Sequence, residues 1–153
     1  MKQHAYPVIA VTDDTGILIH EDWLLRSETV HRQLRPALPE RYADCLQQVF
    51  EHGGRMAVAA DGDRVVAVMV WRLIVNTAYR RALYVDDLVT DPASRSSGAG
   101  KALLDWCADK AVLMQCEWLT LDSGTQRTDA HRFYFRERMH VSSFHFVKRI
   151  GPA

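Results

Sequence analysis

The sequence has no excess of charge of either sign and no long apolar run. Its 19 basic residues (Lys and Arg) balance its 19 acidic residues, so the formal net charge is zero at pH 7. A neutral chain gives no reason to expect general adhesion to nucleic acid or to a membrane surface. No stretch approaches the roughly 20 apolar residues of a membrane span, and residues 1–5 do not open the apolar region of a signal peptide. We therefore expect neither a nucleic-acid nor a membrane partner.

Cysteine is also scarce. Cys45, Cys107 and Cys116 are odd in number, and no two of them form a Cys-x-x-Cys pair. This pattern favours free, buried thiols in the reducing cytoplasm, and we expect no bound metal. The chain shows no internal repeat, low-complexity segment or linker, and 153 residues suffice to bury one core. We expect a single domain over residues 1–153.

The spacing of apolar residues predicts the order of helices and strands. It predicts helices over residues 23–34, 42–50, 98–114 and 128–138, and strands over 56–60, 65–75, 83–90, 118–122 and 143–150. In the helix over 98–114, the residues expected to face inward are Ala99, Ala102, Leu103, Trp106 and Leu113. Hairpins followed by strand–helix–strand–helix–strand predict an α/β (α+β) fold with a mixed, mostly antiparallel central sheet flanked by helices.

Residues 89–101 carry the strongest functional signal. A strand ends at Asp91-Pro92, a polar loop follows, and Gly98 and Gly100 open an amphipathic helix. The first turn of a helix leaves backbone N–H groups unpaired at the positive end of the helix dipole. Phosphates are the usual ligands of such a main-chain site.

Two familiar phosphate-binding motifs do not fit this segment. A dinucleotide-binding fingerprint requires glycine at position 103, where this chain has Leu103. A mononucleotide P-loop requires glycine at 95 and Ser or Thr at 102, where the chain has Arg95 and Ala102. A nucleotide-phosphate enzyme is therefore disfavoured.

The segment resembles instead the pyrophosphate loop of the GNAT superfamily, the acyl-CoA-dependent N-acetyltransferases. The matching positions are Val89, Asp91, Pro92, Arg95, Gly98 and Gly100. Ser96 replaces a frequent glycine, which the loop tolerates if Ser96 need not adopt a positive φ. The resemblance implies that the pyrophosphate of acetyl-CoA is held by Arg95, Ser96, Ser97, Gly98, Ala99, Gly100 and Lys101.

A second segment, residues 121–134, resembles the family's stretch that ends A-x-x-F-Y, here Ala130 to Tyr134. In that family the sheet splays between the strand before the loop and the strand before this segment, here near Thr90 and Asp122. The resemblance implies that pantetheine binds along Leu88, Val89 and Thr90. It also implies that residues 1–54 form the wall of the acceptor site, and dimers are common in the family.

The implied reaction is direct attack of a primary amine, from a small molecule or a peptide, on acetyl-CoA in a ternary complex. Tyr134 matches the family's general acid at the thiolate. Asp86 and Asp122 are alternative general bases, and His145 is a further candidate. Strand alternation places Asp86 and Asp87 on opposite faces, so that only one lines the site.

The structural alternative for Asp86 and Asp87 is that both are solvated or form ion pairs with Arg80 or Arg81. Two positions depart from the family, because Arg127 replaces an asparagine and Ala67 replaces a glycine. A non-catalytic acyl-CoA-binding sensor or interaction module of the same fold is the alternative function. The sequence does not identify the amine acceptor.

Overall fold

The computed structural model describes residues 5–152. Four of the five residues on which the expectation about a signal peptide rests, residues 1–4, lie outside this range. The contacts divide the chain into two compact units, one ending at Leu121 and one beginning at Asp122, and each is described by itself. The first unit contains β1 (Val8–Ala10), α1 (Glu21–Leu34), α2 (Tyr42–Glu51), β2 (Arg55–Asp61), β3 (Arg64–Asn76), β4 (Arg80–Thr90), the 3-10 helix η1 (Pro92–Ser94), α3 (Ala99–Leu113) and β5 (Trp118–Leu121). The second contains α4 (Thr128–Arg136).

The strands form one sheet in the order β1-β2-β3-β4-β5. The first three ladders are antiparallel, and β5 pairs with β4 in parallel. The turn between β2 and β3 places Gly62 at φ +59°, a conformation that glycine adopts at little cost. The turn between β3 and β4 is fixed by Asn76, whose Oδ1 accepts from the backbone N–H groups of Ala78 and Tyr79. The predicted mixed, mostly antiparallel fold is confirmed.

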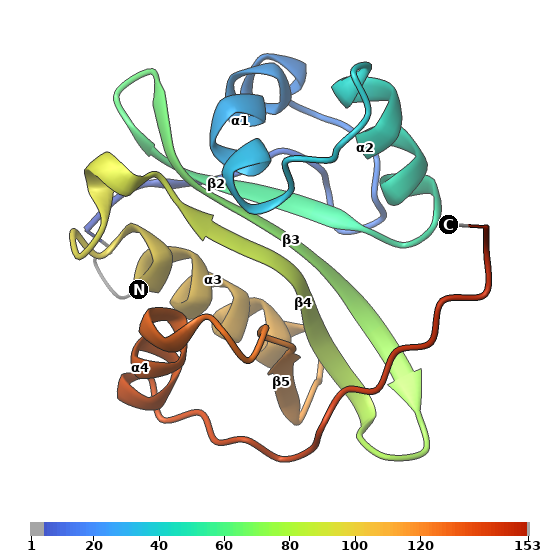
Figure 1. Ribbon diagram of the computed structural model, residues 1–153. Coiled ribbons are helices and arrows are strands. Elements are labelled where there is room, and N and C mark those ends of the chain that lie inside the picture. Colours follow the sequence, from blue (N-terminus) through green and yellow to red (C-terminus); the bar gives the residue numbers. More distant parts are fainter. Residues whose placement is uncertain (1–4, 153) are drawn as a thin grey trace. The chain divides into compact units, whose positions relative to one another are not determined.

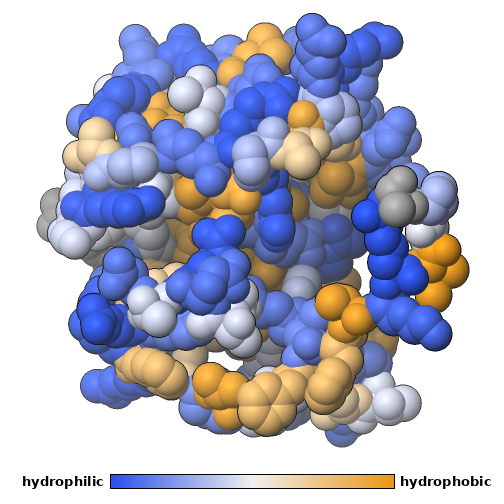
Figure 2. All heavy atoms as spheres, viewed as in Figure 1, coloured by the Kyte–Doolittle hydropathy of each residue, from blue (hydrophilic) through white to orange (hydrophobic). Residues whose placement is uncertain are grey.

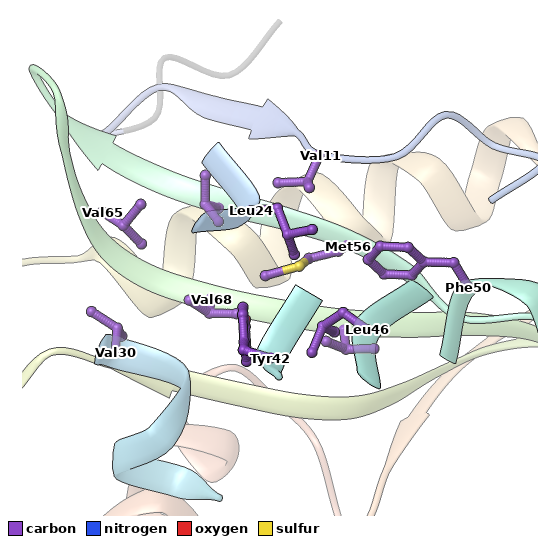
Figure 3. Packing of buried hydrophobic residues seen from close by; sticks show 11 residues of the cluster. Val11, Leu24, Val30, Tyr42, Leu46, Phe50, Met56, Val65 and Val68 are labelled. Atoms are coloured by element: carbon purple, nitrogen blue, oxygen red, sulfur yellow. The ribbon is translucent and has the colours of Figure 1, made fainter. Parts of the chain in front are cut away.

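Helices cover both faces of the sheet in the first unit. Figure 1 shows α1 and α2 on one face and α3 on the other. A continuous core lies between the sheet and the helices α1 and α2 (Figure 3). Its members are Val11, Leu24, Val30, Tyr42, Leu46, Phe50, Met56, Val58, Val65, Val68 and Val70. On the opposite face, the ring of Trp71 meets that of Trp106 from α3 edge-on, with centroids 6.2 Å apart.

Two details of α3 and β4 differ from the prediction. Leu113, expected inward, is 78% exposed. The buried positions Leu103, Cys107 and Ala111 repeat every four residues, so a residue two places beyond Ala111 faces away from this stripe. β4 begins at Arg80 rather than near residue 83, because the tight turn at Asn76 pairs the strand from its first residue.

The predicted strand over residues 143–150 is wrong. In the second unit this segment has no regular secondary structure, and Phe144, Phe146 and Val147 are 80%, 90% and 84% exposed. Figure 2 shows apolar atoms along its course. High β-propensity makes a strand only where a neighbouring strand supplies hydrogen bonds, and no ladder of the described residues includes this segment.

Within residues 5–152, no helix has both the length and the apolar character needed to cross a membrane. Cys45, Cys107 and Cys116 are free thiols, and Cys107 is fully buried in α3. The described part of the chain contains no group of three or more His, Cys, Asp or Glu side chains that could hold a metal ion.

Candidate functional site

The loop between β4 and α3 begins with a tight turn at Asp91. The Asp91 side chain accepts from the N–H of Ala93, and its carbonyl accepts from the N–H of Ser94 at 2.8 Å. The loop ends at Gly98, the N-cap of α3, which lies at φ +93°. A Cβ at this position would be strained whatever the space around it. The first hydrogen bond inside the helix runs from the N–H of Ala102 to the carbonyl of Gly98.

The loop carries unpaired backbone donors at the start of a 15-residue helix. Among residues 5–152, no protein acceptor receives the N–H groups of Ser96, Gly98, Ala99 and Gly100. Unpaired donors at a helix N-terminus attract anions. Arg95 is exposed beside them, whereas Lys101 is bonded to Asp105 at 3.0 Å within α3. The loop therefore has the main-chain geometry of an anion site.

Ser96 has a backbone conformation that favours glycine. It lies at φ +60°, in the left-handed region, so the condition set for tolerating serine at this position is not met. The reversal between η1 and α3 requires a left-handed residue here, and a side chain with a Cβ costs roughly 1–2 kcal/mol in that region. This explains why glycine is frequent at the position, and it means that Ser96 keeps the loop shape at an energetic cost.

The ladder between β4 and β5 ends before β4 does. Pairing runs from Ala82 opposite Trp118 to Val85 opposite Leu121, while β4 continues to Thr90 with β3 as its only strand partner among residues 5–152. Leu88 to Thr90 therefore lie on an open strand edge, where alternate residues direct N–H and C=O groups outward. The predicted divergence of these two strands is confirmed.

A β-bulge changes the orientation of the two aspartates. Asp87 lies opposite Val70 and Val85 opposite Trp71, so Asp86 has no partner of its own on β3. An extra residue in one strand interrupts the alternation of side chains between the faces.

Both carboxylates consequently face α1 and α2, and the prediction of opposite faces is wrong. Asp87 contacts His31 and Arg35 from α1. Asp86 contacts Arg72. Arg72 is the neighbour of Trp71 on β3, and because Trp71 faces α3, Arg72 faces the other side of the sheet. There it donates to the carbonyl of His52 at the end of α2.

Asp86 is held by one guanidinium group. Arg72 donates from Nε to both carboxylate oxygens at 3.0 and 2.9 Å, and from Nη2 to Oδ2 at 2.5 Å. Both side chains are largely buried, with 31% and 22% exposure for Arg72 and Asp86. The predicted partners Arg80 and Arg81 are wrong. Arg81 lies five residues before Asp86 on β4, which is about 17 Å along an extended strand. Its Nε donates to the carbonyl of Met114.

Asp87 belongs to a buried hydrogen-bonded chain. Its Oδ2 lies 2.8 Å from Nε2 of His31, and Nδ1 of His31 lies 2.9 Å from the hydroxyl of Tyr42. That hydroxyl lies 2.9 Å from Oγ of Ser27, which donates to the carbonyl of Leu24 at 2.6 Å. His31, Ser27 and Tyr42 are each at most 3% exposed. A buried chain of polar groups in which every member is paired fixes α1, α2 and β4 in one arrangement.

The carbonyl of Leu24 determines the direction of every bond in this chain. A carbonyl only accepts, so Ser27 donates to it and must accept from Tyr42; Tyr42 in turn accepts from Nδ1–H of His31. At 2.8 Å, Nε2 of His31 and Oδ2 of Asp87 then need one proton between them. His31 and Asp87 therefore share that proton. Every other polar atom in this hydrogen-bonded series already has a partner.

Electrostatics stabilise the charged form of Asp87. Burial alone would raise its pKa, but the hydrogen bonds from His31 and Arg35 outweigh burial and lower the pKa below the ordinary aspartate value. Burial raises the pKa of Tyr42, so its hydroxyl stays protonated as the chain requires. A carboxylate stabilised in this way is a weak proton acceptor.

The second unit holds the other predicted residues. Tyr134 lies on α4, half-buried, with its ring centroid 5.4 Å from that of Phe133. Burial raises the pKa of Tyr134, and Arg127 opposes that shift. Asp122 and His145, both named as base candidates, lie together with 3.2 Å between Oδ2 and Nδ1.

Sequence reasoning missed Arg72, Arg35, His31 and Tyr42 as parts of this site. One signal was available, since Ser27 and His31 are four residues apart on the helix face that also carries Leu24. Two polar residues on a buried stripe require polar partners. No sequence pattern identified those partners, which come from α2 and β4.

The fold and the anion-accepting loop define an α/β protein with an open sheet beside a main-chain anion site. The model of the acetyltransferase (GNAT) family matches residues 19–140. The chain belongs to this family and is an N-acetyltransferase, an acyltransferase enzyme. An N-acetyltransferase of Bacillus subtilis strain 168 described as uncharacterized, YhdJ, is 50% identical over 116 residues, covering 74% of this chain and 81% of that one.

More distant similarities agree. An aminoalkylphosphonate N-acetyltransferase of Salmonella typhimurium LT2 is 36% identical over 66 residues, or 43% of each chain. A ribosomal-protein-alanine N-acetyltransferase of Brucella melitensis biovar Abortus 2308 has a TM-score of 0.74 at 18% identity, covering 95% of this chain and 99% of that one. AAC(6')-Iy in complex with the bisubstrate analogue CoA-S-monomethyl-acetylneamine has a TM-score of 0.75 at 12% identity, covering 95% and 98%. These two structures support the fold alone.

Proposed function

We propose that acetyl-CoA is the acyl donor and that the loop from Arg95 to Lys101 binds its pyrophosphate. The observation that carries this proposal is the row of unpaired N–H groups at Ser96, Gly98, Ala99 and Gly100. The open edge at Leu88 to Thr90 supports it further, because a pantetheine amide can pair with an unpaired strand edge. The AAC(6')-Iy complex holds a CoA-linked analogue on the same fold.

The proposed reaction is direct transfer to a primary amine in a ternary complex. The amine nitrogen attacks the thioester carbon, the N–C bond forms and the C–S bond breaks. A base takes one amine proton, and Tyr134 protonates the departing thiolate. An N–H near Val89 or Thr90 stabilises the oxyanion.

The acceptor is proposed to be a primary amine of a small molecule or a peptide. The similarity to the aminoalkylphosphonate enzyme covers 43% of the chain, which supports a small amine in general terms. The single domain over residues 1–153, the acceptor wall formed by residues 1–54, a homodimer and a cytoplasmic location stay predictions.

The central test measures free CoA thiol released from acetyl-CoA with a panel of amines. Turnover with at least one amine supports the proposal. Tight acetyl-CoA binding without turnover of any amine would favour the alternative of a non-catalytic sensor.

Tyr134→Phe is expected to lower kcat about 100-fold or more, in line with the usual contribution of a general acid. The KM for acetyl-CoA should stay within about twofold, because only the hydroxyl is lost. The raised pKa of Tyr134 keeps the acid protonated through neutral pH. Steady-state kinetics with the best acceptor measures both constants. Phe135→Tyr is the control, because it changes one hydroxyl on a ring of the same helix at a 57% exposed position. This variant should leave kcat unchanged. Unchanged turnover of Tyr134→Phe removes Tyr134 from the mechanism.

The two candidate bases make different predictions. Arg72 binds both oxygens of Asp86, which disfavours Asp86 as a proton acceptor, so we place the base role on Asp122 with His145 beside it. Asp122→Asn should lower kcat/KM at neutral pH about 100-fold, with recovery at high pH as the free amine loses its own proton.

Asp86→Asn should lower the free energy of unfolding, because it removes the carboxylate that pairs with Arg72. It should leave the shape of the pH profile of kcat/KM unchanged. Asp129→Asn, at a 93% exposed position on α4, should change neither. If Asp86→Asn alone abolishes the acidic limb of the profile, the base is Asp86 instead.

A further inference from the structure

The charges around Asp86 and Asp87 also constrain the acceptor, provided that the proposed function holds. Both aspartates stand directly before Leu88 to Thr90, the strand edge assigned to pantetheine. Any amine that attacks an acetyl group presented at this edge approaches these side chains. The relevant elements, α1, α2, β3 and β4, all belong to the first unit.

The two carboxylates are not available to bind a polycationic amine. Arg72 neutralises Asp86, and Arg35 neutralises Asp87 through Nε at 2.8 Å and Nη2 at 2.5 Å from Oδ1. The proton shared by His31 and Asp87 is additional to these two balanced pairs. Counted with the proton that the hydrogen-bond pattern requires, the formal charges of Asp86, Asp87, Arg35, Arg72 and His31 sum to +1.

Arg35 is the member of this cluster that can reach a ligand. It lies at the C-terminal cap of α1, its side chain is 52% exposed, and Nη2 also lies 3.4 Å from the carbonyl of Asp86. In the described chain no acceptor receives the two N–H groups of its Nη1. Arg72, in contrast, is 31% exposed, and its Nη1 donates to the carbonyl of His52. An anchored guanidinium with one open nitrogen is suited to bind a carboxylate or a phosphonate.

We propose that the acceptor is an amine that also carries an acidic group, and that Arg35 is the specificity-determining residue that binds this group. The fixed contact with Asp87 holds the guanidinium in place before the acceptor arrives, which limits the entropy lost on binding. The net positive charge of the cluster favours the acid-bearing amine over a plain amine and disfavours a polyamine.

The experiment compares acceptors matched in length. 2-Aminoethylphosphonate and β-alanine carry an acid, propylamine lacks it, and spermidine is a polycation. With acetyl-CoA as donor, we expect kcat/KM for the better acid-bearing amine to exceed that of propylamine about tenfold to hundredfold, the range of a hydrogen bond to a charged group. Equal rates for acid and plain amines, or a preference for spermidine, overturn the inference and leave the proposed function intact. Failure of every amine contradicts the proposed function itself.

Arg35→Gln should remove this preference, and Arg35→Lys should keep part of it. The readout is the ratio of kcat/KM for two acceptors in one sample, which does not depend on the fraction of enzyme that is folded. Arg26→Gln is the matched control, since Arg26 lies on the same helix, is 42% exposed and pairs with Asp63. The KM for acetyl-CoA should not change. A raised KM for acetyl-CoA with the acceptor preference retained would show that Arg35 binds a donor phosphate, which overturns the inference.

Discussion

Gly98→Glu is expected to weaken acetyl-CoA binding at least about 100-fold, because several charge-assisted hydrogen bonds of roughly 1.5–3 kcal/mol each are lost together. Gly98 lies at φ +93° between the unpaired N–H groups of the loop, so a side chain here strains the turn that presents those groups. The new carboxylate also places negative charge where the pyrophosphate is proposed to bind. Titration calorimetry with acetyl-CoA measures the dissociation constant directly.

The control separates the effect of strain from the effect of position. Gly62 also has a positive φ, +59°, and a Cβ built there meets nothing within 4 Å. Gly62→Glu therefore imposes a left-handed glutamate in the β2–β3 turn while leaving the loop before α3 intact. It should bind acetyl-CoA as the unmodified protein does. Normal affinity in Gly98→Glu would refute the assignment of this loop to the cofactor.

The loop could be predicted from the sequence because its geometry is local. Asp91-Pro92 ends a strand, and Gly98 supplies the left-handed N-cap of α3. Each of these features depends on the backbone preferences of one or two residues. The same locality explains why the helices and β2 to β4 were predicted within a few residues of their observed bounds.

The features that sequence reasoning missed depend on residues far apart in the chain. The bulge at Asp86 arises from the register of β4 against β3, which no period-two pattern within β4 reveals. It brings Asp86 and Asp87 to the same face and makes Arg72 and Arg35 their partners. The wrong prediction of a strand over residues 143–150 has the same cause. Whether a strand forms depends on a pairing partner elsewhere in the chain, and the composition of the segment does not reveal that partner.

The largest effect on folding is expected from Asp87. Asp87→Asn should lower the free energy of unfolding at pH 7 by about 3 kcal/mol, the scale for removing one partner of a buried ion pair. The variant leaves His31, which is 2% exposed, without the anion that shares its proton, and it leaves Arg35 without its main acceptor. Urea denaturation followed by circular dichroism measures the change. Asp63→Asn, which breaks a pair that is 96% exposed on the aspartate side, should cost less than about 1 kcal/mol.

The pH dependence of stability tests the cause of this effect. The pKa of Asp87 is lower in the folded protein than in the unfolded chain, so its ionisation stabilises the fold above the unfolded pKa of about 3.9. That contribution disappears as the pH falls through the lower, folded pKa. The part of the stability gap between the unmodified protein and Asp87→Asn that comes from this ionisation should therefore be fully present at about pH 5 and shrink below about pH 4.

A double-mutant cycle with His31→Gln identifies the partner responsible. If the proton shared by Nε2 and Oδ2 couples the two residues, the interaction energy between Asp87→Asn and His31→Gln should be about 2 kcal/mol. Independent, additive effects of the two substitutions would show that Asp87 is stabilised by Arg35 alone. In that case the net positive charge assigned to the cluster would be lost, and with it the electrostatic argument for an acid-bearing acceptor.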